Sequence, residues 1–113
     1  MKLGLISAIL GDLSFEEMID FLAECGLECV EVACWPKGKA ERRYAGVSHI
    51  DVDTLDDEKC AHILDYCQKK GVEISSLAYY PNTMDPDVEK RTAYIEHLHK
   101  LIDASAKLGV NMI

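Results

Sequence analysis

Short apolar runs alternate along the chain with longer segments in which apolar residues recur every three to four positions. The runs have the length of strands that are buried on both faces. They span residues 3–10, 29–34 and 72–80, and a fourth run begins at Val110. The longer segments place their apolar side chains on one helical face. They span residues 14–25, 54–70 and 86–108. The pattern predicts strands and helices in strict alternation.

Residues at the segment ends support these boundaries. A glycine follows each expected helix and opens an apolar–polar–apolar triplet, at Gly26, Gly71 and Gly109. Glycine fits the left-handed conformation that ends many helices. Ser14 and Glu17 have the spacing of a capping box. Asp85 before Pro86 predicts an N-cap followed by proline in the first helical position.

The alternation predicts parallel strands with right-handed crossovers. Val30 and Val32 suit the face covered by helices, so Glu31 lies on the opposite face, where its carboxylate avoids a costly apolar burial. Aligning two strands on their glycines pairs Val30 with Ser75 and Glu31 with Ser76. A barrel interior accepts a carboxylate among small residues, whereas a doubly wound sheet favours branched apolar residues on both faces. A barrel is therefore favoured over a flavodoxin-like sheet.

Two large aromatic residues, Trp35 and Tyr80, end the second and third apolar runs on the same expected face as Glu31. In a parallel barrel, ligands bind at the carboxyl ends of the strands. The two rings are therefore either packing residues or part of a ligand-binding surface.

Composition narrows the function classes. The chain has 113 residues, of which 49% are apolar and 28% charged, as expected for one domain over residues 1–113. A net charge of −8 argues against a nucleic-acid partner, which would require a basic face. No window approaches the roughly 20 apolar residues of a membrane span. The start lacks a signal-peptide pattern, and the five cysteines lack Cys-x-x-Cys spacing, so we expect a cytoplasmic protein with reduced thiols.

Three stretches resemble the sugar phosphate isomerase/epimerase family of xylose isomerase-like TIM barrels. Residues 26–36 resemble the second strand of that family, and residues 71–82 resemble the third strand and its loop. Residues 44–51 resemble a loop of one subgroup. The resemblance implies the N-terminal half of a (β/α)8 barrel, with three βα units and the start of strand four.

The resemblance also implies a function in carbohydrate metabolism. Trp35 and Tyr80 would offer apolar surfaces to a small sugar or sugar phosphate, Asn82 would hydrogen-bond it, and His49 would reach it from a loop. In the family, two glutamates, an aspartate and a histidine of later strands hold a divalent metal (manganese, magnesium, cobalt or zinc), and the glutamates move the proton. Those positions lie outside this chain, so we expect no metal site, no assignable catalytic residue and no isomerase activity from it alone.

Two alternatives remain open at this stage. The first is a non-enzymatic half-barrel that acts as an assembly unit. The second is a fragment of a barrel similar to the abasic-site endonucleases, which place histidines at the ends of early strands. This chain has Cys34-Trp35 and Tyr79-Tyr80 at those positions. Under any of these readings the open edges of a half-barrel predict a homo-oligomer.

Overall fold

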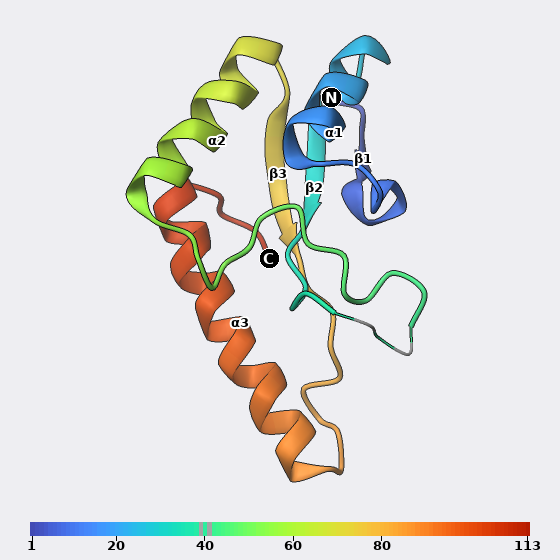
Figure 1. Cartoon of the computed structure of the whole chain (residues 1–113), viewed down its shortest axis with the longest axis vertical. Helices are drawn as coiled ribbons and strands as arrows, with labels where there is room; N and C mark the ends of the chain where they lie inside the picture. The colour runs from blue at the N-terminus through green and yellow to red at the C-terminus, as the bar shows by residue number, and fades with distance from the viewer. Residues whose placement is uncertain (39, 41) are drawn as a thin grey trace.

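Three parallel strands form one sheet, in the order β1-β2-β3, in a computed structural model that describes residues 1–38, 40 and 42–113. The strands are β1 (Gly4–Ile6), β2 (Cys29–Ala33) and β3 (Glu73–Ala78). The helices are the short 3-10 helix η1 (Ser7–Leu10) and the α-helices α1 (Phe15–Glu24), α2 (Asp57–Lys70) and α3 (Val88–Leu108). Spatial order follows chain order, as in successive βα units of a barrel (Figure 1). The predicted fold class, α/β with part of a TIM barrel, is confirmed.

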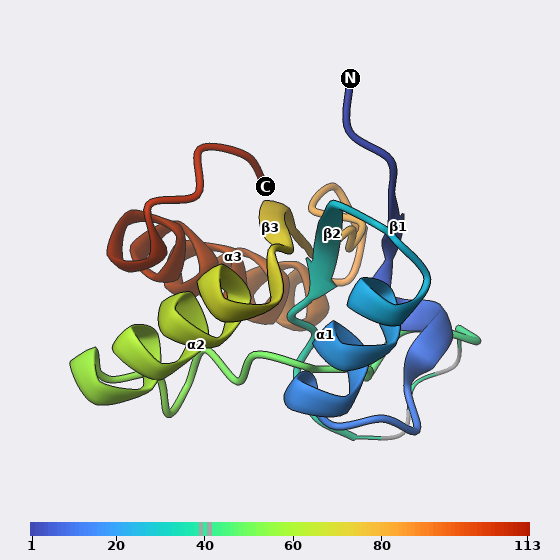
Figure 2. The same cartoon turned by 90° about the horizontal axis from the view of Figure 1, so that it is seen from above.

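Each predicted strand is shorter in the structure, the first most of all, and the predicted start of a fourth strand is not a strand. Residues 3–10 form a strand only over Gly4–Ile6, and the chain then turns into η1. The turn is held by Ser7, whose hydroxyl accepts a hydrogen bond from the Ala33 backbone N–H at 2.8 Å. Residues 110–113 are not a strand, but the Leu77 N–H donates to the Met112 carbonyl at 3.0 Å. This segment therefore runs beside β3, near the C-terminus in Figure 2, where a fourth strand would pair.

The predicted helix boundaries hold at most ends. Ser14 and Glu17 form the capping box of α1, and the glycines after the helices have positive φ, at Gly26, Gly71 and Gly109. The predicted N-cap of α3 is wrong by two residues. Asp87 caps this helix by accepting from the N–H groups of Glu89 and Lys90, whereas Asp85 accepts from the Asp87 N–H. Pro86 therefore precedes α3, because the Asp87 carboxylate accepts from two of the backbone N–H groups that lack a partner at the start of this helix.

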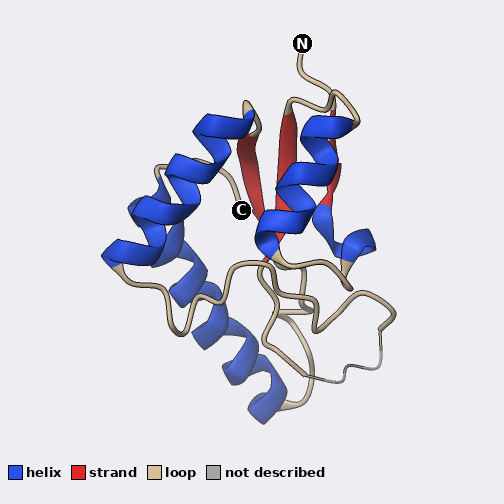
Figure 3. Cartoon of the chain, turned by 45° about the horizontal axis from the view of Figure 1, so that its top comes forward, coloured by secondary structure: helices blue, strands red, loops and turns tan. Residues whose placement is uncertain are grey.

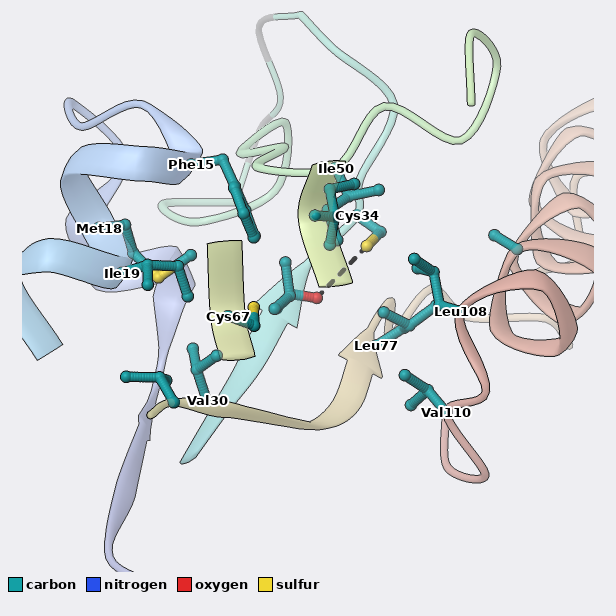
Figure 4. Close-up of a cluster of buried hydrophobic side chains, with 14 of the residues drawn as sticks. Phe15, Met18, Ile19, Val30, Cys34, Ile50, Cys67, Leu77, Leu108 and Val110 are labelled. Carbon is teal, nitrogen blue, oxygen red and sulfur yellow. Dashed lines mark hydrogen bonds between the residues drawn. The ribbon is translucent and has the colours of Figure 1, made fainter. Parts of the chain in front are cut away.

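The core lies between one face of the sheet and the α-helices. Val30 and Val32 are fully buried on this face, as predicted. They belong to one core cluster with α1 side chains such as Met18 and Ile19, and Figure 4 labels Val30 with these two. The register pairs Glu31 with Ser76, as predicted, but a bulge pairs Val30 with Ile74 and not with Ser75. The extra residue is accommodated because the Ser75 hydroxyl donates to the Val30 carbonyl at 3.1 Å.

The cysteines behave as small apolar side chains. Cys34, Cys60 and Cys67 are buried, and all five thiols of the chain are free. Burial raises the pKa of Cys34 to about 12 and that of Cys67 to about 11, which keeps both thiols protonated and unreactive. Among the helices of the described residues, none combines the length and apolar character needed to cross a bilayer.

Candidate functional site at the carboxyl ends of the strands

The loops that follow β2 and β3 gather at one end of the sheet (Figure 3). The first half of α3 extends past the strands toward the same end (Figure 1). This is the carboxyl end of the parallel strands, where barrels bind their ligands. Two groups of side chains lie here, one on the sheet face away from the helices and one between the loops.

The first group is the Glu31 cluster, which consists of Glu31, Ser76 and Tyr80. The Ser76 hydroxyl donates to one carboxylate oxygen of Glu31 at 3.1 Å, and the Tyr80 hydroxyl donates to the other. These bonds confirm that the three side chains share the face opposite to Val30 and Val32. Ser76 is buried, while Tyr80 keeps half of its surface exposed. The cluster thus presents a carboxylate held by two hydroxyls beside an accessible ring.

The second group is the loop pocket, a hollow of about 500 Å³ between the two loops and α3. Its wall combines aromatic, basic and other polar side chains. They are Trp35, Tyr79 and Tyr94; Lys37, Arg42 and Lys90; and Asn82 and Asp85. The volume lies within the range of small-molecule sites. The rings of Trp35 and Tyr79 meet edge to face, with centroids 4.9 Å apart.

His97 supports the aromatic wall from behind. It is 7% exposed, its Nε2 lies 2.8 Å from the Cys34 carbonyl oxygen, and its ring meets that of Tyr79 at 4.6 Å. A carbonyl only accepts, so Nε2 carries the proton and donates. The sequence pattern did not single out this histidine as a site residue. Helical spacing could have predicted the burial of His97. It lies on one helical face with Leu101, Ala104 and Leu108, the other buried residues of α3.

The four residues predicted to bind a substrate lie in three places. Trp35 and Asn82 both border the loop pocket, and Tyr80 belongs to the Glu31 cluster. The expectation that Trp35 and Tyr80 share one face is wrong, because Trp35 packs on the ring of Tyr79 and not beside Tyr80. His49 lies apart from both groups, beside η1. The structure therefore brings together two of the four predicted residues.

Internal hydrogen bonds occupy both ring nitrogens of His49. Its Nε2 lies 3.2 Å from the Leu10 carbonyl oxygen and its Nδ1 lies 2.9 Å from the Ser7 hydroxyl oxygen. Because the carbonyl requires a donor, Nε2 carries the proton and the Ser7 hydroxyl donates to Nδ1. Burial lowers the pKa of His49, which favours this neutral ring. His49 thus ties the loop after β2 to η1.

Side chains that could bind a metal lie singly or in pairs among the described residues. No group of three or more histidine, cysteine, aspartate or glutamate side chains comes together in this part of the chain. Glu31 has only hydroxyls as neighbours in its cluster, whereas protein metal sites usually combine three or more strong ligands. His62 and Glu16, 2.8 Å apart on the exposed surface of α2 and α1, supply only two.

A further hollow of about 460 Å³ lies at the opposite ends of the strands, where Lys2, Glu28 and Gln68 contribute to its wall. It lies far from the loops that follow β2 and β3. Because parallel barrels bind ligands at the carboxyl ends, the Glu31 cluster and the loop pocket are the stronger candidates.

Parallel strands in chain order, each followed by a helix, and polar groups at their carboxyl ends define a segment of a (β/α)8 barrel. A family model described as xylose isomerase-like TIM barrel matches residues 19–113. This match covers most of the chain, and the protein therefore belongs to the xylose isomerase-like TIM barrel family. A search of curated proteins found no match to the chain.

Proposed function

We propose that this chain forms the early-strand wall of a binding site for a small sugar or sugar phosphate, in a barrel of the isomerase/epimerase type. The Glu31 cluster is the observation that carries the proposal. Its carboxylate accepts from sugar hydroxyls with the lone pairs that Ser76 and Tyr80 leave free. The half-exposed Tyr80 ring offers an apolar face to the carbon side of a sugar ring. The buried reduced thiols support a cytoplasmic location.

The proposed role is binding without turnover. Isomerisation next to a carbonyl needs a positioned base and, in this family, a metal that holds the substrate oxygens. Glu31 is the single carboxylate of its cluster, and both of its oxygens accept from neighbouring hydroxyls. A catalytic pair of carboxylates is therefore not formed by the described residues of this cluster.

A ketose or ketose phosphate is expected to bind the Glu31 cluster saturably without being converted. Nuclear magnetic resonance titration should shift the Ser76 and Tyr80 amides, while a coupled assay records no product. Tyr80→Leu should weaken binding about 2- to 10-fold, because a ring contact contributes about 0.5–1.5 kcal/mol. Tyr44→Leu is the matched control, since Tyr44 is also half-exposed but lies outside the cluster. Turnover that disappears in Glu31→Gln would contradict the binding-only role.

Divalent metals are expected to bind the chain weakly and without defined stoichiometry. Calorimetric titration with manganese, cobalt, magnesium or zinc should show no tight step, because the described histidines are dispersed. His97 bonds to a carbonyl, and His62 has one carboxylate neighbour. The variant His62→Gln is the control for surface binding and should change little. A one-to-one step of micromolar affinity would refute the expectation, and its loss in His97→Gln or His99→Gln would locate the site.

A second candidate function, an assembly unit without enzymatic activity, is favoured by the surface near β1. Leu3, Ile6 and Ile9 are exposed at 68%, 37% and 53%, and β1 pairs only with β2 among the described strands. Apolar side chains beside an unpaired strand edge favour association with another chain.

A further inference from the structure

We propose that the loop pocket is a separate binding site for a small organic anion that combines a ring with a phosphate or carboxylate group. The proposal does not depend on sugar binding at the Glu31 cluster, because the two groups use different side chains. Consecutive residues of an extended segment point to opposite sides. Tyr79 accordingly borders the pocket, whereas Tyr80 bonds to Glu31.

The charge of the pocket points to an anion. Among the described residues of its wall, Lys37, Arg42 and Lys90 are basic and Asp85 is the one acidic side chain. The chain as a whole has the opposite balance, with 12 basic and 20 acidic residues. Lys37 lies 3.3 Å from Asp51, outside the pocket, while Lys90 forms no ion pair with any of the described residues. A ligand anion would supply the partner that Lys90 lacks there.

The aromatic wall points to a ring on the same ligand. Trp35 is partly buried and keeps surface toward the pocket, and Tyr94 borders it from α3. Tyr79 is 4% exposed and is held between Trp35 and His97 by edge-to-face contacts. This support from the core fixes the Trp35 side of the pocket before a ligand arrives, which lowers the ordering cost of binding. Asn82 adds an amide that can donate or accept.

The test uses Trp35 as its own reporter, since it is the only tryptophan of the chain. Phenyl phosphate and benzoate serve as probes of the two anionic groups, and phenol and inorganic phosphate represent the ring and the anion alone. We expect each aryl anion to change Trp35 fluorescence saturably and to bind about 10-fold more tightly than phenol. The affinity should fall as salt rises, because the contacts are partly exposed ion pairs.

Substitutions of basic residues inside and outside the pocket distinguish a specific binding site from nonspecific electrostatic attraction of anions. Arg42→Gln and Lys90→Gln should each weaken phenyl phosphate about 5- to 10-fold, the value of one charge-assisted hydrogen bond at a partly exposed site. Arg43→Gln and Lys107→Gln are matched controls that remove the same charges outside the pocket wall. They should change the affinity less than 2-fold. Circular dichroism and denaturant unfolding verify that each variant is folded.

Two results would show that the loop pocket is not a specific anion site. One is the absence of saturable fluorescence change with either aryl anion, and the other is equal weakening by Arg42→Gln and Arg43→Gln. Tyr80→Leu distinguishes this site from the proposed sugar site. It should leave phenyl phosphate binding unchanged, whereas a loss of binding in this variant would show that the two sites are one and refute their separation.

Discussion

Replacing Leu77 by alanine is expected to lower the free energy of unfolding by about 2–5 kcal/mol. Leu77 lies in β3, has no exposed surface, and belongs to the core formed with the helices. Removal of its branched end leaves a cavity that the surrounding strands and helices fill only partly. Small domains have a total stability of about 5–15 kcal/mol, so the loss is a large share of it. Urea unfolding followed by circular dichroism measures the change.

The matched control for this substitution is Leu64→Ala. Leu64 lies on α2 with 43% of its surface exposed, and its removal should cost less than about 1 kcal/mol. Equal destabilisation by the two substitutions would show that β3 is not the centre of the core. Loss of cooperativity in Leu77→Ala with an unchanged midpoint would contradict the cavity explanation as well.

The 113-residue chain is expected to associate with a second copy through the sheet face opposite to the helices. Ile6 pairs in register with Glu31 and shares this face, with 37% of its surface exposed. Burial of about 400 Å² of such surface contributes roughly 10 kcal/mol, before the cost of association. Two-fold symmetry is the simplest closed arrangement, because it covers the same surface on both copies. Light scattering coupled to size-exclusion chromatography should report a dimer.

Ile6→Lys tests which surface is used. The substitution removes apolar surface and places an ammonium in the interface beside Glu31. Dimer affinity should fall by about 100-fold or more, because removing a charge from water costs several kcal/mol even when a carboxylate lies nearby. Ile102→Lys is the control, because Ile102 is 49% exposed on α3, in the helical layer. It should leave the dimer intact. A cooperatively unfolding monomer of the unaltered chain at micromolar concentration would refute the association.

The sequence by itself determined the order of strands and helices, most of their ends and the two faces of β2. These features depend on local chemistry. A capping box needs only Ser14 and Glu17, and a left-handed glycine such as Gly71 ends a helix wherever it occurs. The placement of Val30 and Glu31 on opposite faces follows from the alternation of side chains along any strand.

Tertiary structure alone decided which of the candidate site residues lie in contact with one another. Ser7 ends β1 because it bonds to the backbone of Ala33, 26 residues away, and the same hydroxyl draws His49 out of the site. His97 reaches the Cys34 carbonyl across 63 residues and thereby supports the wall of the loop pocket. Such contacts depend on the paths of the loops and on how α3 packs. Periodicity does not encode these paths, because it reports only which face of an element is buried and not which distant backbone group lies against it.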